Sequence, residues 1–326
     1  MPDLTTRFTR AFGLAHPVAL APMAGVAGGA LAAAVAQAGG LGLLGGGYGD
    51  PDWLAREWDL AGDVPIGAGF ITWSLTAPVL AAALARHPQA VMLSFGDPAP
   101  FASAIHAARV PLICQVQALE HVRAALDAGA QVIVAQGAEA GGHGARRATM
   151  TLVPEVADYL AAHAPEVLLL AAGGIADGRG LAAALMLGAD GVLVGTRFSV
   201  SAESLTPQGF RAAAIAARGD ATLRTQSVDA ARGLDWPAPF DIRVVASDFT
   251  AEWHHDADHL RSPEAAPLRA RFLAAQSAGD ARHGAAVMGE AVGLIHDAPP
   301  AGEVLARMSR GAAEILARHA PGLLGG

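Results

Sequence analysis

The sequence contains no lysine, so arginine supplies all 22 of its basic residues, against 30 acidic ones. The resulting formal net charge of −8 argues against nucleic acid as a partner, because nucleic-acid-binding surfaces are rich in positive charge. A single cysteine, Cys114, excludes an internal disulfide framework. Because Cys114 lies in the apolar run PLICQVQ, the sequence predicts a buried core thiol rather than a nucleophile.

A long uninterrupted hydrophobic run is also missing. In the longest apolar stretch, residues 30–47, Gln37 and many glycines interrupt the run, which indicates a helix followed by a strand rather than a membrane span. No apolar run follows the arginines of residues 1–13, so no secretory signal is predicted and we expect a cytoplasmic protein. Because aromatic residues make up 5% of the chain and hydrophobic residues 52%, the core must be mainly aliphatic.

What the chain does contain is a repeated alternation of short apolar runs with alanine-rich helical stretches. Eight such runs begin at Pro17, Leu41, Pro65, Ala90, Pro111, Gln131, Glu166 and Gly191. Continuous apolar strands are typical of a sheet buried on both faces, and parallel strands need a crossover helix between neighbours. An open doubly wound sheet gives similar local signals, but the count of eight favours a closed (β/α)8 barrel, the TIM barrel.

After Phe198 the alternation stops. Residues 208–218 are expected to form a further helix, and the next stretch becomes irregular and more polar. We therefore predict a barrel built from residues 1–218 and 286–326, with a smaller, mostly helical unit inserted at residues 219–285 as a lid over its open end. The final amphipathic stretch, residues 298–319, is expected to return and pack on the barrel.

Glycines follow the seventh and eighth predicted strands, where barrels of this kind commonly bind phosphate. Gly173 and Gly174 end the seventh strand, and Gly195 and Thr196 end the eighth. Glycine lets backbone N–H groups approach an anion closely, although glycines at strand ends also simply turn the chain. The sequence GLGLLG at residues 40–45 matches a dinucleotide fingerprint, but a helix precedes it and a strand follows, the reverse of the required order.

A histidine lies in the glycine-rich segment that follows the sixth predicted strand. Gly141, Gly142 and Gly144 surround His143 in a predicted loop at the catalytic end of the barrel. Imidazole can accept or donate a proton near neutral pH, so His143 is the candidate catalytic group. A turn histidine with a structural hydrogen bond is the alternative.

Several segments together carry a family resemblance. They are APMAG at residues 21–25, QGAEAGGHG at 136–144, AAGGIADGRG at 171–180, GVLVGTRF at 191–198 and GEAVGLI at 289–295. In this order they resemble the nitronate monooxygenase family of barrel enzymes, which implies an FMN cofactor and His143 as the catalytic histidine. The implied FMN contacts are Ala21, Pro22 and Met23 against the isoalloxazine ring, Gln115 and Gln136 at its polar edge or ribityl chain, Gly141 and Gly142 beside it, and Gly173, Gly174, Gly195 and Thr196 at its phosphate.

The resemblance also implies the reaction, in which O2 and FMN oxidise an alkyl nitronate to a carbonyl compound and nitrite. His143 would orient the nitronate anion or deprotonate a neutral nitroalkane. The expected partners are a small-molecule substrate and O2. A homodimer is a possible assembly. Two alternatives stay open, an NAD(P)H-dependent flavin reductase of quinones or enoyl thioesters, and a non-catalytic flavin-binding module.

Other residues invite functional interpretations that the sequence supports less well. His255 and His259 are spaced to share a helix face, but no supporting HExxH pattern accompanies them, so no metal site is predicted and the segment is expected to be a solvated lid helix. Trp73 and Phe95 could form an apolar substrate wall or simply pack at the top of the barrel. Asp177 is expected to cap the helix after the seventh strand.

Overall fold

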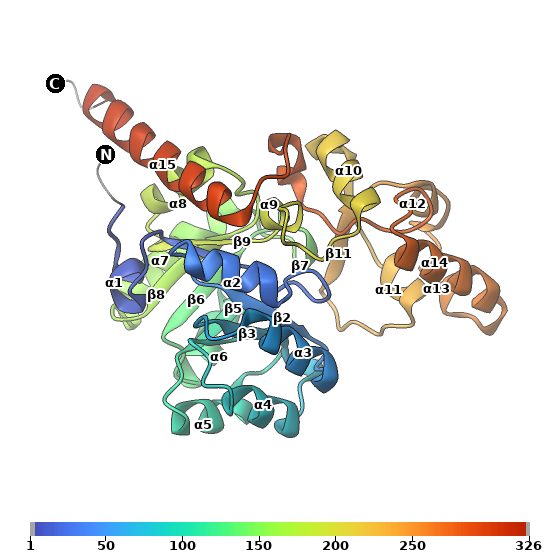
Figure 1. Ribbon diagram of the computed structural model, residues 1–326, viewed down its shortest axis with the longest axis horizontal. Helices are drawn as coiled ribbons and strands as arrows, with labels where there is room; N and C mark the ends of the chain where they lie inside the picture. The colour runs from blue at the N-terminus through green and yellow to red at the C-terminus, as the bar shows by residue number, and fades with distance from the viewer. Residues whose placement is uncertain (1–3, 324–326) are drawn as a thin grey trace.

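A computed structural model describes residues 4–323, with side chains up to Arg318, and its central feature is a barrel of eight parallel strands (Figure 1). Each predicted apolar run contains one of them. The strands are β1 (Val18–Leu20), β2 (Leu43–Gly47), β3 (Gly67–Ile71), β4 (Val91–Ser94), β5 (Leu112–Val116), β6 (Val132–Gln136), β8 (Leu168–Ala172) and β9 (Gly191–Val194). Neighbours pair in sequence, β9 pairs with β1, and a parallel bridge from Ala19 to Leu41 closes the circle, which confirms the predicted barrel.

Helices cover the outside of the barrel. They are α2 (Gly29–Gln37), α3 (Pro51–Ala61), α4 (Ala77–Leu84), α5 (Ala99–Ala107), α6 (Glu120–Asp127), α7 (Thr149–His163) and α8 (Gly178–Met186), with the short helices η1 (Thr72–Ser74) and α9 (Thr196–Ser199) at strand ends. Asp177 accepts hydrogen bonds from the backbone N–H groups of Arg179 and Gly180, so its predicted capping role is confirmed. The last helix, α15 (Ala301–Leu323), packs on α8 and α2, as expected (Figure 1).

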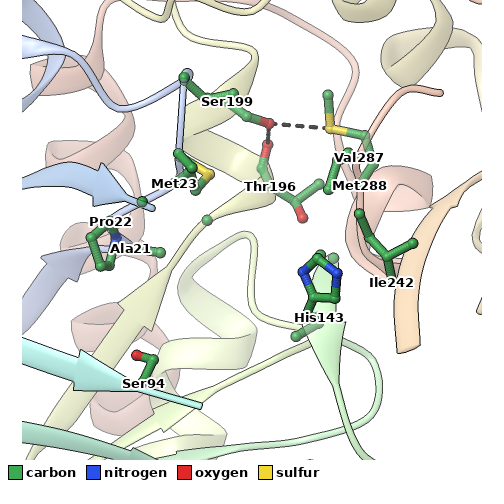
Figure 2. A pocket seen from close by; sticks show the side chains of 18 of the residues that line it. Ala21, Pro22, Met23, Ser94, His143, Thr196, Ser199, Ile242, Val287 and Met288 are labelled. Atoms are coloured by element: carbon green, nitrogen blue, oxygen red, sulfur yellow. Dashed lines mark hydrogen bonds between the residues drawn. The ribbon is translucent and has the colours of Figure 1, made fainter. Parts of the chain in front are cut away.

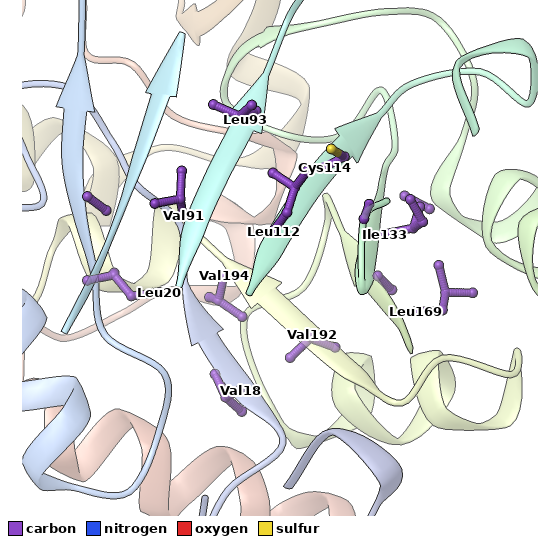
Figure 3. Close-up of a cluster of buried hydrophobic side chains, with 14 of the residues drawn as sticks. Val18, Leu20, Val91, Leu93, Leu112, Cys114, Ile133, Leu169, Val192 and Val194 are labelled. Carbon is purple, nitrogen blue, oxygen red and sulfur yellow. The ribbon is translucent and has the colours of Figure 1, made fainter. Parts of the chain in front are cut away.

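Successive side chains of each strand enter two different cores, because alternate residues of a strand point to opposite faces. Outward residues such as Val18, Leu20 and Val91 pack beneath the surrounding helices (Figure 3). The inward set, with Met92 and Val134 among its members, fills the barrel interior, and Phe8 of α1 (Arg7–Phe12) joins it. Phe8 approaches Gly191 at the start of β9, so α1 plugs the end of the barrel opposite to the strands' carboxyl ends.

Cys114 belongs to the outer core, as predicted, and its side chain is buried (Figure 3). Burial raises the pKa of this thiol to about 12 because the thiolate loses its hydration. We expect the native protein to show no reaction with Ellman's reagent at pH 8, and one equivalent of thiol to react after unfolding in guanidinium chloride. Rapid labelling of the folded protein would contradict this assignment.

The chain beyond the barrel has more sheet than the sequence predicts. Its elements are α10 (Gln208–Ala216), η2 (Gly219–Ala221), β10 (Thr222–Thr225), α11 (Ser227–Arg232), β11 (Asp241–Val245), α12 (Asp248–Trp253), α13 (Ala257–Arg261), η3 (Pro263–Ala265), α14 (Ala266–Ala278) and η4 (Glu290–Leu294). Helices α11 to α14 lie together at one side of the barrel, with β11 between them and the barrel (Figure 1). No helix within residues 4–323 is both long and apolar enough to cross a membrane.

The predicted loop around His143 is wrong in one respect. Residues Gly142–Gly144 form a short strand, β7, that pairs antiparallel with β11 and through it with β10. His143 lies opposite Ile242 in this register. The partner strand lies about one hundred residues later in the chain, so local sequence could not reveal the pairing.

Candidate active site

A cavity of about 500 Å³ opens at the carboxyl ends of the barrel strands. Its size lies within the range of small-molecule and cofactor sites. All twelve residues proposed from the sequence line it: Ala21, Pro22, Met23, Gln115, Gln136, Gly141, Gly142, His143, Gly173, Gly174, Gly195 and Thr196. The structure therefore brings the whole predicted set together, and the role of each member stays a prediction.

One side of the cavity is an apolar surface made by the segment after β1. Ala21, Pro22 and Met23 lie there, and His143 lies on the opposite side (Figure 2). The segment can lie so close to β3 because residue 69 is glycine. A Cβ atom at Gly69 would meet Pro22 Cγ at 2.2 Å, far inside van der Waals contact. A flat ring system can stack on such a surface.

The ends of β8 and β9 offer a set of free donors. Among the described residues, no acceptor receives a hydrogen bond from the backbone N–H of Gly173, Gly174, Gly195 or Thr196. Gly173 and Gly174 have φ values of 100° and 74°, which favour glycine. The Thr196 hydroxyl accepts from the Gly289 N–H at 2.9 Å, so its own hydrogen stays available. Unpaired N–H groups clustered in this position fit a phosphate.

Three glutamines connect the carboxyl ends of β5 and β6 to β7. The Oε1 of Gln136 accepts from Gln115 Nε2 at 3.1 Å and from Gln117 Nε2 at 3.0 Å, and Gln136 Nε2 donates to the His143 carbonyl at 3.1 Å. Gln117 is buried and was not predicted. Gln136 therefore fixes the backbone of His143 through its Nε2 donor, while its Oε1 already accepts two hydrogen bonds. No hydrogen bond from the described residues reaches Gln115 Oε1, so this oxygen can accept one from a ligand.

His143 is buried, and its ring points from β7 into the cavity (Figure 2). Its Nε2 lies 2.8 Å from Oδ2 of Asp229, a buried residue of α11. The indole of Trp236 stacks on the imidazole, with ring centroids 3.3 Å apart and planes 8° from parallel. Burial lowers the pKa of His143 below its ordinary value, and the hydrogen bond and charge of Asp229 oppose that effect only in part. This lowered pKa favours the neutral imidazole near pH 7.

Two arginines hold the segment that carries His143. Arg224 donates from its guanidinium to the carbonyls of Ala138, Ala140, Gly142 and Asp241. Arg243 donates to the Ala138 carbonyl at 3.1 Å and pairs with Glu290. Burial, and then the nearby charge of Arg243, lower the pKa of Arg224 to about 10, so it remains charged at neutral pH. Both arginines come from the strands that the sequence analysis missed.

The cavity carries little charge of its own. Among the described residues, Arg232 lines the cavity, and no other arginine, aspartate or glutamate does. Arg232 lies over the Tyr48 ring at 5.9 Å, and the Tyr48 hydroxyl accepts from the Trp236 indole N–H at 2.9 Å. An anion that enters this end of the cavity meets one cation within an aromatic wall.

That wall differs from the predicted pair. Phe95 lines the cavity, but Trp73 does not and instead packs edge-on against Trp236 at 5.5 Å. Trp236, Asp229 and Arg232 were not predicted to line or support the site. All three follow β10, where the sequence shows no regular hydrophobic pattern, and Asp229 lies 86 positions after His143, so no spacing pattern joins them.

The histidines of the inserted segment do not share a helix face. His255 lies in the turn between α12 and α13, and His259 lies in α13, stacked on Trp253 at 5.3 Å. Within the described residues, no group of three or more His, Cys, Asp or Glu side chains is arranged to hold a metal ion. The predicted continuous helix through this segment is therefore wrong, because the chain turns at His254 and His255.

Comparisons with known proteins agree with this fold. The model of the family "Nitronate monooxygenase" matches residues 5–70 and 76–311. A nitronate monooxygenase of Neurospora crassa is 35% identical over 92% of this chain and 90% of its own length. The structure of FabK from Thermotoga maritima superposes with a TM-score of 0.84 at 29% identity, covering 97% of this chain and 98% of that one. Nitroalkane oxidase from Streptomyces ansochromogenes gives 0.78 at 25% identity, covering 94% and 98%. The chain belongs to the nitronate monooxygenase family.

Proposed function

We propose that this protein uses FMN and O2 to oxidise alkyl nitronates to carbonyl compounds and nitrite. Members of the family are flavoenzymes. The observation that carries the proposal is the pairing of one neutral base, His143, with one lining cation, Arg232, in a cavity whose opposite side is a flat apolar surface. A nitronate is a planar anion, so this end of the cavity suits it better than a neutral substrate.

The residues present fit FMN in particular. A single phosphate would be held by the free N–H groups of Gly173, Gly174, Gly195 and Thr196, and the ring would rest on Ala21, Pro22 and Met23. Gln115 would contact the polar edge of the ring or the ribityl chain, and Gly141 and Gly142 would allow close approach. When bound, FMN supplies the redox chemistry by accepting electrons from the nitronate and passing them to O2.

The protein's own contribution is to bind, orient and exclude water. Arg232 holds the negatively charged nitro oxygens, and the Tyr48 and Trp236 rings shield the reacting carbon. His143 accepts the proton when the substrate arrives as a neutral nitroalkane. Residues 219–285 contribute Arg232 and Trp236 to the lining, so we propose that this segment is the lid. Its boundaries, a cytoplasmic location and a homodimeric assembly stay predictions.

The direct test is to reconstitute the purified protein with FMN, add a propyl nitronate under air, and measure nitrite and oxygen consumption. We expect both to depend on FMN. Rapid anaerobic bleaching by NADH or NADPH, without nitrite formation in the aerobic assay, would instead identify the flavin reductase. A protein that binds FMN and responds to no donor would be the non-catalytic flavin module.

Replacing Arg232 with methionine should raise KM for a nitronate about tenfold, because the cation binds the anion in the ground state as well as in the transition state. kcat should change by less than threefold. The matched control is Arg271→Met, which removes the same charge from an exposed position on α14. Equal KM values for the two variants would show that Arg232 does not bind the substrate.

A further inference from the structure

We propose that Asp229 is a positioning residue that holds His143 in the tautomer with hydrogen on Nε2, so that Nδ1 is the nitrogen that accepts the substrate's proton. This inference rests on the proposed function for its chemical role. It gives the inserted segment a role in the proton transfer, because Asp229 lies in α11 of that segment, whereas His143 lies in β7.

The tautomer follows from what a carboxylate can do. Asp229 Oδ2 and His143 Nε2 are 2.8 Å apart, and the two side chains are only 4% and 8% exposed. An ionised carboxylate accepts hydrogen bonds and donates none, so the hydrogen between the two atoms belongs to Nε2. Neutral imidazole carries one N–H hydrogen, which leaves a lone pair on Nδ1. A carboxylate partner fixes histidine tautomers in this way in other enzymes.

Among the described residues, His143 is the only hydrogen-bond partner of the Asp229 carboxylate. Oδ1 of Asp229 is buried and has no hydrogen-bond partner among the described residues, and the nearest cation is Arg232, whose Nη1 lies 3.8 Å away. Three charged residues affect the titration of His143, namely Asp229 and Arg232 from α11 and Arg224 from β10. Trp236 covers one face of the ring. Among the described residues, Asp229 is therefore the one negative group placed to stabilise a protonated His143.

The proton transfer balances without a further reactant. The C–H bond next to the nitro group breaks, the proton goes to Nδ1, and the electron pair stays on the substrate as the nitronate. His143 becomes an imidazolium that donates from Nε2 to Asp229, while Arg232 faces the new anion. Because Asp229 and Arg232 lie three residues apart on α11, one short helix presents the partners of both charges that the step creates.

A readout independent of activity is the ¹⁵N NMR spectrum of histidine-labelled protein, with the His143 signals assigned through His143→Gln. We expect His143 of the wild-type protein to carry its hydrogen on Nε2 over the whole neutral range, with or without FMN. Asp229→Asn should change the tautomer population and lower the pKa of His143 by about one unit or more, because the favourable negative charge is gone. The conservative Asp229→Glu variant should restore the Nε2–H tautomer at least in part.

The matched control is Ser227→Ala, which removes a buried hydrogen bond of the same helix to Thr225 and leaves the His143 contact intact. It should leave the tautomer and the pKa of His143 unchanged. A wild-type spectrum with the hydrogen on Nδ1 would overturn the proposal without any variant. So would an Asp229→Asn spectrum that shows the wild-type tautomer and titration.

Kinetics then test the role. Asp229→Asn should lower kcat for a neutral nitroalkane on the order of 10²-fold while changing KM little, and it should affect a preformed nitronate far less. Equal losses on both substrates would point to a structural role and overturn the proposal. Failure of the proposed function gives a distinguishable result: the wild-type protein would make no nitrite, while the NMR spectra would still show His143 with its hydrogen on Nε2.

Discussion

Replacing His143 with glutamine should lower kcat/KM for a neutral nitroalkane by about 10²- to 10⁴-fold, the usual contribution of a positioned general base. His143 is the neutral imidazole that lines the cavity, and glutamine of similar length can hydrogen-bond but cannot accept the proton. A preformed nitronate bypasses proton removal, so its turnover should fall by less than tenfold. Nitrite release from each substrate, measured at several concentrations, gives both values.

The pH dependence of kcat/KM also tests whether His143 is the base. The base must be neutral to accept a proton, and burial lowers the pKa of His143 below 6.5. The acid limb of kcat/KM for the nitroalkane should therefore have its midpoint below pH 6.5, and the rate should be flat through pH 7. His143→Gln should lose this limb altogether.

The control for this variant is His163→Gln, at an exposed histidine near the end of α7 that stacks on Tyr159. It should retain the wild-type rate and pH profile. If His143→Gln reduced the turnover of nitroalkane and nitronate by the same factor, the residue would serve in binding or structure and not as the base. A midpoint above pH 6.5 in the wild-type protein would contradict the effect of burial.

The barrel could be predicted because its determinants are local. Each strand is a short apolar run buried on both faces, and most helices follow within a few residues, so hydrophobic pattern and glycine punctuation locate both. The later sheet has no such signature. β10 reads TLRT and β11 reads DIRVV, and each contains an arginine that turns toward the backbone carbonyls around Ala138 rather than to solvent. Those contacts exist only after folding.

The same difference between local and long-range determinants separates two sides of the site. The side proposed for FMN comes from residues at strand ends, and the barrel geometry alone brings Gly173, Gly195 and Met23 to one cavity. The substrate side is assembled from distant parts of the chain, and the partners of His143 are an aspartate and a tryptophan in a stretch without regular pattern. The sequence therefore singled out His143 as a candidate but could not identify the residues that contact its ring.

Replacing Gly69 with alanine should weaken FMN binding. The added Cβ would lie 2.2 Å from Pro22 Cγ and 2.6 Å from Pro22 Cβ, so Pro22 and its neighbours must shift, which alters the cavity surface on which the ring would rest. We expect the Kd for FMN to rise at least tenfold. Forcing an extra carbon into a packed interior typically costs about 1–3 kcal/mol, so the free energy of unfolding should fall by a similar amount.

Fluorescence titration of the apoprotein with FMN measures the affinity, and urea denaturation measures the stability. Gly311→Ala in α15 is the matched control, because its Cβ would meet the Gly178 Cα at 3.5 Å, an ordinary contact, and alanine favours the helix by about 0.5–1 kcal/mol. This variant should bind FMN normally and unfold at slightly higher urea. A Gly69→Ala protein with wild-type affinity for FMN would show that the ring does not rest on the Ala21–Met23 surface.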